Sequence, residues 1–169
     1  CEQSLEEASV GIMTRPRHLG PRLFTLDEAQ ALLPFLQERL ARLQDVQARY
    51  EGCRREISIL RLVSASGGDE SNPDVREYNR LRALEKALFE ELLALQEEIA
   101  GTGCLAKSFR QGLIDFFALK EGRLVFLCWK QGEQGIHAWH TLEGGFRGRM
   151  PIASFLTEGF PAPDPEEET

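Results

Sequence analysis

Apolar residues recur every three or four positions along two long stretches of the chain, with polar residues between them. This spacing places the apolar side chains along one side of an α-helix. The first stretch starts after Thr25, whose hydroxyl can cap free N–H groups while Glu28, three residues on, reaches back to it. We predict a helix from there to about Val63, with these apolar positions: Leu32, Leu36, Leu40, Leu43, Val46, Tyr50, Cys53, Ile57 and Leu60.

The second stretch starts at Asn72-Pro73, a capping residue followed by proline at the first helical position. It ends at the glycines of 101–103, which favour a helix C-terminus. Its stripe contains Tyr78, Leu81, Leu88, Leu92, Leu95 and Ile99. We expect the two stripes to face each other, so that residues 24–103 form a long antiparallel hairpin. Pro34 lies inside the first helix and predicts a kink there.

The predicted helices are long for a chain of this size. At about 1.5 Å per residue they span roughly 55 Å and 40 Å, more than a compact domain requires. Leu84, Phe89 and Leu93 lie off the main stripe of the second helix and predict a further contact surface. A second copy of the chain is the simplest occupant, giving a coiled-coil homodimer, and another protein is also open. Alternatively, the hairpin packs against the C-terminal part of the chain, which then covers these three apolar residues.

A different pattern follows residue 103. Three β-branched and aromatic segments, 113–119, 123–129 and 136–141, are each bounded by turns that contain glycine. We therefore predict an α+β fold, in which the hairpin is followed by a small three-stranded antiparallel β-meander within residues 104–157. Residues 1–23 are expected to be a flexible extension, and residues 158–169 a flexible acidic tail.

The positions of the turns set the register of the strands. With turn centres at Glu121-Gly122 and Glu133-Gln134, one face of the sheet carries Asp115, Cys128 and Trp139 in a row. The opposite face is nearly all apolar and should pack on the helices. In this register His140 is the polar exception on that second face.

Composition limits the classes of partner. The 169 residues are 42% hydrophobic and 28% charged, and the formal net charge is −7. This charge opposes nucleic-acid binding, which depends on clustered Lys and Arg. A short basic segment, with Arg15, Arg17, His18 and Arg22, is the exception. No apolar run approaches the roughly 20 residues of a membrane-spanning helix. The four scattered cysteines fit reduced thiols and a cytoplasmic location.

One group of polar residues lies among the aromatic residues of the predicted sheet. A carboxylate, a thiolate and an imidazole suit zinc or a similar metal, and a charged group beside a tryptophan can orient a small ligand. The predicted register separates His140 from the others, so we assign no metal ligands and no cofactor. Hydrogen-bonded core residues are the structural alternative. The candidate ligand-binding residues are Asp115, Cys128, Lys130, His137, Trp139 and His140.

A second candidate follows the last predicted strand. Arg147 and Arg149 flank glycines and can form an anion-binding loop from guanidinium groups and free backbone N–H groups. Alternatively they pair with the glutamate-rich helices or with Glu143.

The sequence also resembles a known family. The similar segments are 24–34, 112–116, 127–133, Trp139-His140 and 144–149, and the tryptophan-bearing strands and the glycine-arginine segment are the most specific of them. They resemble the bacterial family catalogued as domain of unknown function 2203, from about Phe24 to Ile152. The resemblance implies the same layout and transfers no catalytic residue.

These observations support two functional hypotheses. The leading one is a non-enzymatic protein-interaction or oligomerisation module that uses the helical hairpin. The alternative is a small-ligand or metal-binding protein, or an enzyme, with its site on the β-meander. The sequence contains no Gly-x-Ser-x-Gly, phosphate-loop or His-Glu-x-x-His motif, so it names no reaction.

Overall fold

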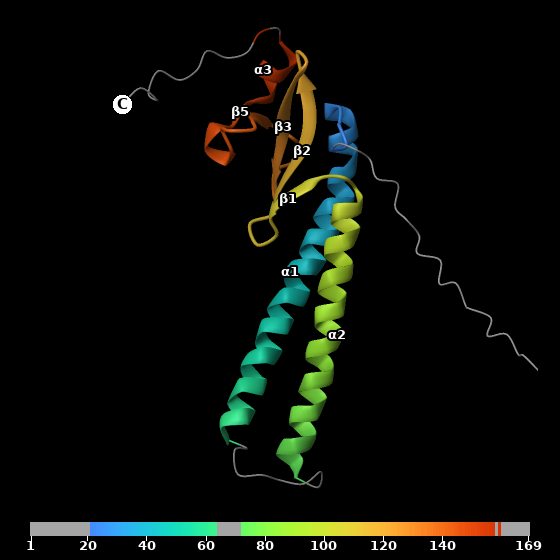
Figure 1. Cartoon of the computed structure of the whole chain (residues 1–169), viewed down its shortest axis with the longest axis vertical. Coiled ribbons are helices and arrows are strands. Elements are labelled where there is room, and N and C mark those ends of the chain that lie inside the picture. The colour runs from blue at the N-terminus through green and yellow to red at the C-terminus, as the bar shows by residue number, and fades with distance from the viewer. Residues whose placement is uncertain (1–20, 64–71, 158, 160–169) are drawn as a thin grey trace, which may run out of the picture.

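The computed structural model describes residues 21–63, 72–157 and 159. Helix α1 spans Leu26–Val63 and helix α2 spans Pro73–Gly101, and the two run antiparallel along most of the molecule (Figure 1). Both predicted helices are therefore confirmed. The predicted loop at 64–71, most of the predicted extension at 1–23 and nearly all of the tail at 158–169 lie outside the described residues. Within the described residues, neither long helix has an apolar segment suited to crossing a membrane.

Local hydrogen bonds explain where the helices begin. The Thr25 backbone N–H donates to Glu28 Oε2 at 2.8 Å, and the Glu28 N–H donates to Thr25 Oγ1 at 3.2 Å. This reciprocal pair is the predicted capping box. At the start of α2, the Asp74 N–H donates to Asn72 Oδ1 at 2.9 Å, and Pro73 occupies the first helical position without a free donor.

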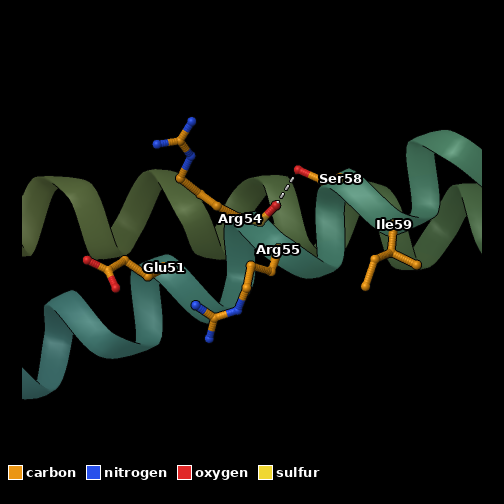
Figure 2. Close-up of a pocket in the computed structure, with 5 residues that line it drawn as sticks. All are labelled: Glu51, Arg54, Arg55, Ser58 and Ile59. Carbon is orange, nitrogen blue, oxygen red and sulfur yellow. Dashed lines mark hydrogen bonds between the residues drawn. The ribbon is translucent and has the colours of Figure 1, made fainter.

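The apolar stripes of α1 and α2 meet in one continuous seam. Across its edges, Arg39 pairs with Glu98 at 2.7 Å and Arg42 pairs with Glu91 at 2.5 Å. The outer side of α1 is largely polar near its C-terminal end, where Ser58 Oγ donates to the carbonyl oxygen of Arg54 (Figure 2). The buried residues of the seam are Leu36, Leu40, Leu43, Val46, Cys53, Ile57, Leu81, Leu88, Leu92, Leu95 and Ile99.

The sheet has five strands, so the prediction of three was wrong. Their bounds are β1 Leu105–Ser108, β2 Leu113–Lys120, β3 Arg123–Lys130, β4 Ala138–Thr141 and β5 Met150–Pro151. They form an antiparallel sheet in the order β1-β2-β3-β4-β5. The two additional strands are short edge strands of four and two residues, too short to show an alternating pattern.

The predicted register is confirmed for the first hairpin and wrong for the second. Glu121 and Gly122 form the β2–β3 turn with φ of 49° and 76°, and Asp115 lies opposite Cys128 as expected. After β3 the Glu133 N–H donates to the carbonyl oxygen of Lys130, so the chain turns at Gln131 and Gly132 instead of at the predicted Glu133-Gln134, and the pairing of β4 with β3 shifts by one residue. Cys128 therefore lies opposite Ala138 instead of Trp139.

This one-residue difference reverses the faces of β4 because successive strand residues point to opposite sides. Trp139 belongs to the face that packs on the helices, and its indole Nε1 donates to Ser154 Oγ at 2.8 Å. His140 joins Asp115 and Cys128 on the opposite face.

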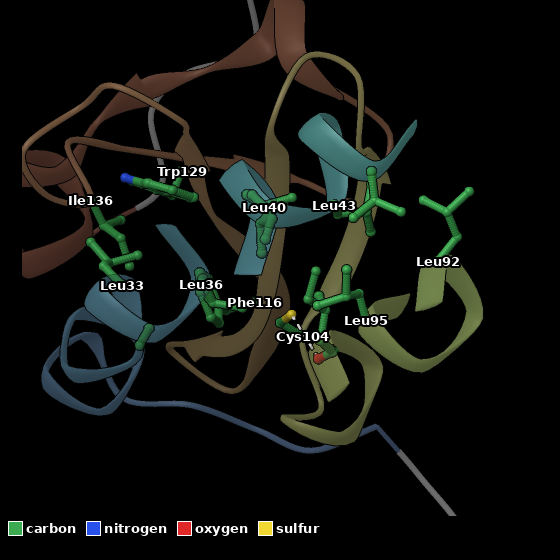
Figure 3. Close-up of a cluster of buried hydrophobic side chains, with 14 of the residues drawn as sticks. Leu33, Leu36, Leu40, Leu43, Leu92, Leu95, Cys104, Phe116, Trp129 and Ile136 are labelled. Atoms are coloured by element: carbon green, nitrogen blue, oxygen red, sulfur yellow. Dashed lines mark hydrogen bonds between the residues drawn. The ribbon is translucent and has the colours of Figure 1, made fainter. Parts of the chain in front are cut away.

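The main core lies between the sheet and the half of the hairpin that carries the N-terminus of α1 and the C-terminus of α2. Figure 3 shows Phe116 and Trp129 of the sheet beside leucines of α1 and α2. Gln44 fixes the edge of this contact by donating to the Phe109 carbonyl and to Gln131 Oε1. The other half of the hairpin extends past the sheet (Figure 1).

The chain after β4 closes one end of the sheet. It forms a short 3-10 helix, η1 (Phe146–Gly148), then β5 and helix α3 (Ile152–Leu156). The buried Lys120 amine holds this end through hydrogen bonds to the carbonyls of Phe155 and Thr157, at 3.1 and 2.6 Å. Ile152 and Phe155 pack against the main core.

Candidate functional site

Three polar side chains from three neighbouring strands converge on the face of the sheet opposite the helices. Asp115 comes from β2, Cys128 from β3 and His140 from β4, and each is 2% exposed. One carboxylate oxygen, the sulfur and one ring nitrogen all lie within 4.8 Å of one another. We call these three residues the sheet cluster.

The hydrogen bonds of His140 fix the orientation of its ring. Nδ1 lies 2.7 Å from the carbonyl oxygen of Thr141, and a carbonyl accepts, so Nδ1 carries a proton. Nε2 is directed at Asp115 Oδ2, 3.3 Å away. Burial alone lowers the pKa of His140, but the hydrogen bonds to Asp115 and Thr141 and the charge of Asp115 outweigh it and raise the pKa. This favours an imidazolium that donates from both nitrogens.

Cys128 is a protonated thiol in this environment. Burial raises its pKa to about 12, helped by the charge of Asp115 and by a hydrogen bond to that carboxylate. A thiol is a weak nucleophile until it loses its proton. The cluster therefore does not activate Cys128 for covalent catalysis in the arrangement described, although Cys, His and Asp are the residue types of a nucleophilic triad.

The surroundings of the cluster are aromatic and cationic. The ring of Phe126 lies 5.3 Å from the His140 ring, between centroids. Lys107 of β1 places its amine 3.9 Å from Asp115 Oδ2 and 4.8 Å from the Phe126 centroid. The Lys107 side chain is 46% exposed, so it lies between the buried Asp115 carboxylate and the solvent.

The other sheet residues in the predicted site lie elsewhere. Lys130 is exposed, and its amine lies 5.9 Å from the Phe146 centroid. His137 is exposed in the loop before β4, and Trp139 is buried on the helix-packed face. The structure therefore brings together Asp115, Cys128 and His140 and separates them from the remaining three.

The two arginines do not share one environment. Arg149 Nη2 donates to both carboxylate oxygens of Glu133, at 2.8 and 2.9 Å, and lies 3.4 Å from the carbonyl oxygen of Cys128. Arg147 is exposed in η1. Arg149 thus pairs with the β3–β4 turn, and not with Glu143 or the helices as expected under the ion-pair alternative.

Sequence reasoning missed Lys107 and Glu133, the charged neighbours of the cluster. Lys107 lies on the unpredicted strand β1, whose four residues carry no alternation that would reveal it. For Glu133 the sequence contained a signal. In a Gln-Gly-Glu turn after Lys130, the glutamate carboxylate can hydrogen-bond to the backbone at the end of the preceding strand. Glu133 Oε2 does accept from the Lys130 N–H at 2.8 Å.

A second surface lies on the part of the hairpin that extends past the sheet. We call residues 47–63 of α1 with 73–90 of α2 the distal arm. Its interior contains Cys53, Ile57, Leu81 and Leu88, a single row between two helices. Leu84 is partly buried against this core, so its predicted position off the stripe was wrong.

Apolar side chains remain exposed on and beside the distal arm. Phe89 and Leu93 are 47% and 46% exposed, and the Tyr50 ring lies 6.0 Å from that of Phe89. These three residues are the apolar patch. Tyr50 and Phe89 line a shallow hollow of about 370 Å³ with Arg82, Glu85 and Lys86. A second hollow, of about 550 Å³, is lined by Glu51, Arg54, Arg55, Ser58 and Ile59 of α1 (Figure 2).

Comparison with known proteins identifies the family. The family model described as "Uncharacterized conserved protein (DUF2203)" matches residues 22–152, and the chain belongs to this family. The match covers both helices and all five strands, and it includes the sheet cluster. No curated protein and no solved structure matches the chain. The resemblance inferred from the sequence is thereby confirmed.

Proposed function

We propose that this protein is a non-enzymatic interaction module that self-associates through the apolar patch beside the distal arm. The observation that supports the proposal is the exposure of Phe89 and Leu93 on one side of α2, with the ring of Tyr50 beside that of Phe89. Residues four apart on a helix lie on the same side, so Phe89 and Leu93 form a continuous apolar surface.

The construction of the distal arm favours association. Two helices joined by one row of side chains bury less apolar surface per residue than the part that also packs on the sheet. A partner helix pair would cover the remaining apolar side chains and convert a two-helix structure into a four-helix one. Apolar contact is the dominant favourable term in most protein association.

A second copy of the chain is the partner we favour. The patch is flanked by charges of both signs: Arg82 and Lys86 lie beside Glu85 in the same hollow. A two-fold interface brings the same surface of two copies together, so it requires such self-complementary charge. A uniformly acidic or basic rim would instead favour a partner of opposite charge.

Sedimentation velocity and native mass spectrometry of the whole chain at micromolar concentrations test this proposal. We expect a dimer for the wild-type protein and a monomer for the double variant Phe89→Glu/Leu93→Glu. In the variant, each apolar side chain that the dimer interface would bury is replaced by a charge. Both positions are exposed in the single chain, so the fold should be retained, which circular dichroism checks.

The matched control is Leu119→Glu. Leu119 is 51% exposed but lies on β2, away from the distal arm, so this variant should remain dimeric. A wild-type protein that is strictly monomeric and retains no partner would overturn the proposal. So would a double variant that dimerises as strongly as the wild type.

A further inference from the structure

The sheet cluster has the composition of a metal site. Asp115, Cys128 and His140 offer one oxygen, one sulfur and one nitrogen within 4.8 Å of one another. Tetrahedral zinc sites use these three ligand types, at distances of about 2.0–2.3 Å from the metal. At those bond lengths, any two ligand atoms of a tetrahedral ion lie roughly 3.3–3.8 Å apart, so an inward rotation of the side chains would complete the geometry.

The second observation is the orientation of His140. Its Nδ1 donates to the backbone carbonyl of Thr141, which leaves Nε2 as the nitrogen directed at Asp115 and the cluster centre. Metal-binding histidines commonly donate their other ring N–H to a carbonyl or carboxylate, which fixes both the tautomer and the ring direction. A backbone acceptor holds this orientation whatever the adjacent side chains do.

Burial and scaffold also fit a bound ion. All three side chains are 2% exposed and are held by adjacent, hydrogen-bonded strands, so their spacing is set by the sheet and not by a loop. We propose that Asp115, Cys128 and His140 bind a divalent transition-metal ion of intermediate softness, such as zinc. The three residues leave one coordination position for water or another small ligand.

Charge balance supports the same site. A thiolate from Cys128 and a carboxylate from Asp115 together neutralise a divalent ion, which a buried site requires. Lys107 and Arg149 are the nearby cations and Glu133 is the nearby anion. Lys107 lies 3.9 Å from Asp115 and weakens binding by repulsion.

Cobalt provides a direct test because Co²⁺ occupies zinc sites and absorbs visible light. Protein cleared with a chelator is titrated with Co²⁺ alone. We expect saturation at one ion per chain, with visible bands of tetrahedral Co²⁺ and a near-ultraviolet band from thiolate-to-cobalt charge transfer. Added Zn²⁺ should abolish both. Loss of a residue that only hydrogen-bonds to a metal ligand costs about 10–100-fold in metal affinity. Cys128 is itself a proposed ligand, so Cys128→Ser should weaken Co²⁺ binding by about 100-fold or more.

Matched controls are present in the chain. Cys53 and Cys104 are also buried thiols, but they belong to the hydrophobic core, and their sulfurs donate to the carbonyls of Leu81 and Ile99 in α2. Cys53→Ser and Cys104→Ser should therefore keep the cobalt spectrum. Lys107→Met should bind Co²⁺ more tightly, because it removes the repelling charge. This variant tests the site independently if Cys128→Ser fails to fold. The proposal is overturned if stoichiometric Co²⁺ gives no charge-transfer band, or if the band persists in Cys128→Ser.

Discussion

Gly112 lies in the turn between β1 and β2, where replacement by alanine creates two separate costs. Its φ is 63°, in the left-handed region, and a Cβ there would lie 2.3 Å from Gln131 Cβ and 2.5 Å from Gln131 Oε1. Backbone strain costs about 1–2 kcal/mol. Overpacking adds about 1–3 kcal/mol because Gln131 is fixed through its N–H to the Gly112 carbonyl and through Gln44. We expect Gly112→Ala to lower the free energy of unfolding by about 2–5 kcal/mol.

Gly122→Ala is the matched control. Gly122 has a φ of 76°, but a Cβ there meets nothing within 4 Å, so only the backbone strain remains. We expect a loss of about 1–2 kcal/mol for this variant. The difference between the two variants therefore isolates the steric contact with Gln131.

Urea unfolding measures both variants. Trp129 and Trp139 both lie in the sheet, so tryptophan fluorescence follows the sheet, whereas far-ultraviolet circular dichroism follows mainly the two long helices. Coincident curves would show that the hairpin and the sheet unfold together. The reasoning is refuted if Gly112→Ala is as stable as Gly122→Ala, because the crowding at Gln131 would then carry no energy.

Three further variants test other parts of the fold. Lys120→Met removes an amine that donates to two carbonyls in and just after α3, and we expect a loss of about 1–3 kcal/mol with faster hydrogen exchange in α3. Leu36→Ala, at a fully buried position, should cost about 2–5 kcal/mol in thermal or urea unfolding, whereas Ile59→Ala, at a position 60% exposed, should change little. The hydrogen bonds from Thr25 hold the pKa of Glu28 in the folded protein below its ordinary value of 4.5. The ionised Glu28 therefore stabilises the fold at pH values above the pKa it has in the unfolded chain. This stabilisation is lost as the pH falls through the lower pKa of the folded protein. NMR titration should show this lowered pKa, and a Glu28 pKa at or above 4.5 would contradict the capping geometry.

The helices were predictable because their signals are local. Thr25 with Glu28, and Asn72 with Pro73, mark helix starts within four residues, and the apolar spacing then determines which side is buried. No long-range contact is needed to recognise these features. The predicted bounds consequently match the structure.

The sheet cluster was only partly predictable because it depends on one turn. The residues Asp115 and Cys128 were correctly paired, since the two-residue turn at 121–122 admits one register. The β3–β4 connection is longer, and a one-residue error there placed His140 on the wrong face. Lys107 could not be placed because the pairing of β1 depends on a bulged contact with β2 that no local pattern specifies.

The sheet is attached to the beginning of α1 and the end of α2, while the ends of the helices at Val63 and Pro73 lie far from it (Figure 1). The reach of the projecting part is therefore separable from the rest of the molecule. Seven residues added to each helix would preserve the phase of the seam and lengthen the arm by about 10 Å. Relatives could in this way hold their associating surfaces at different distances from an unchanged sheet.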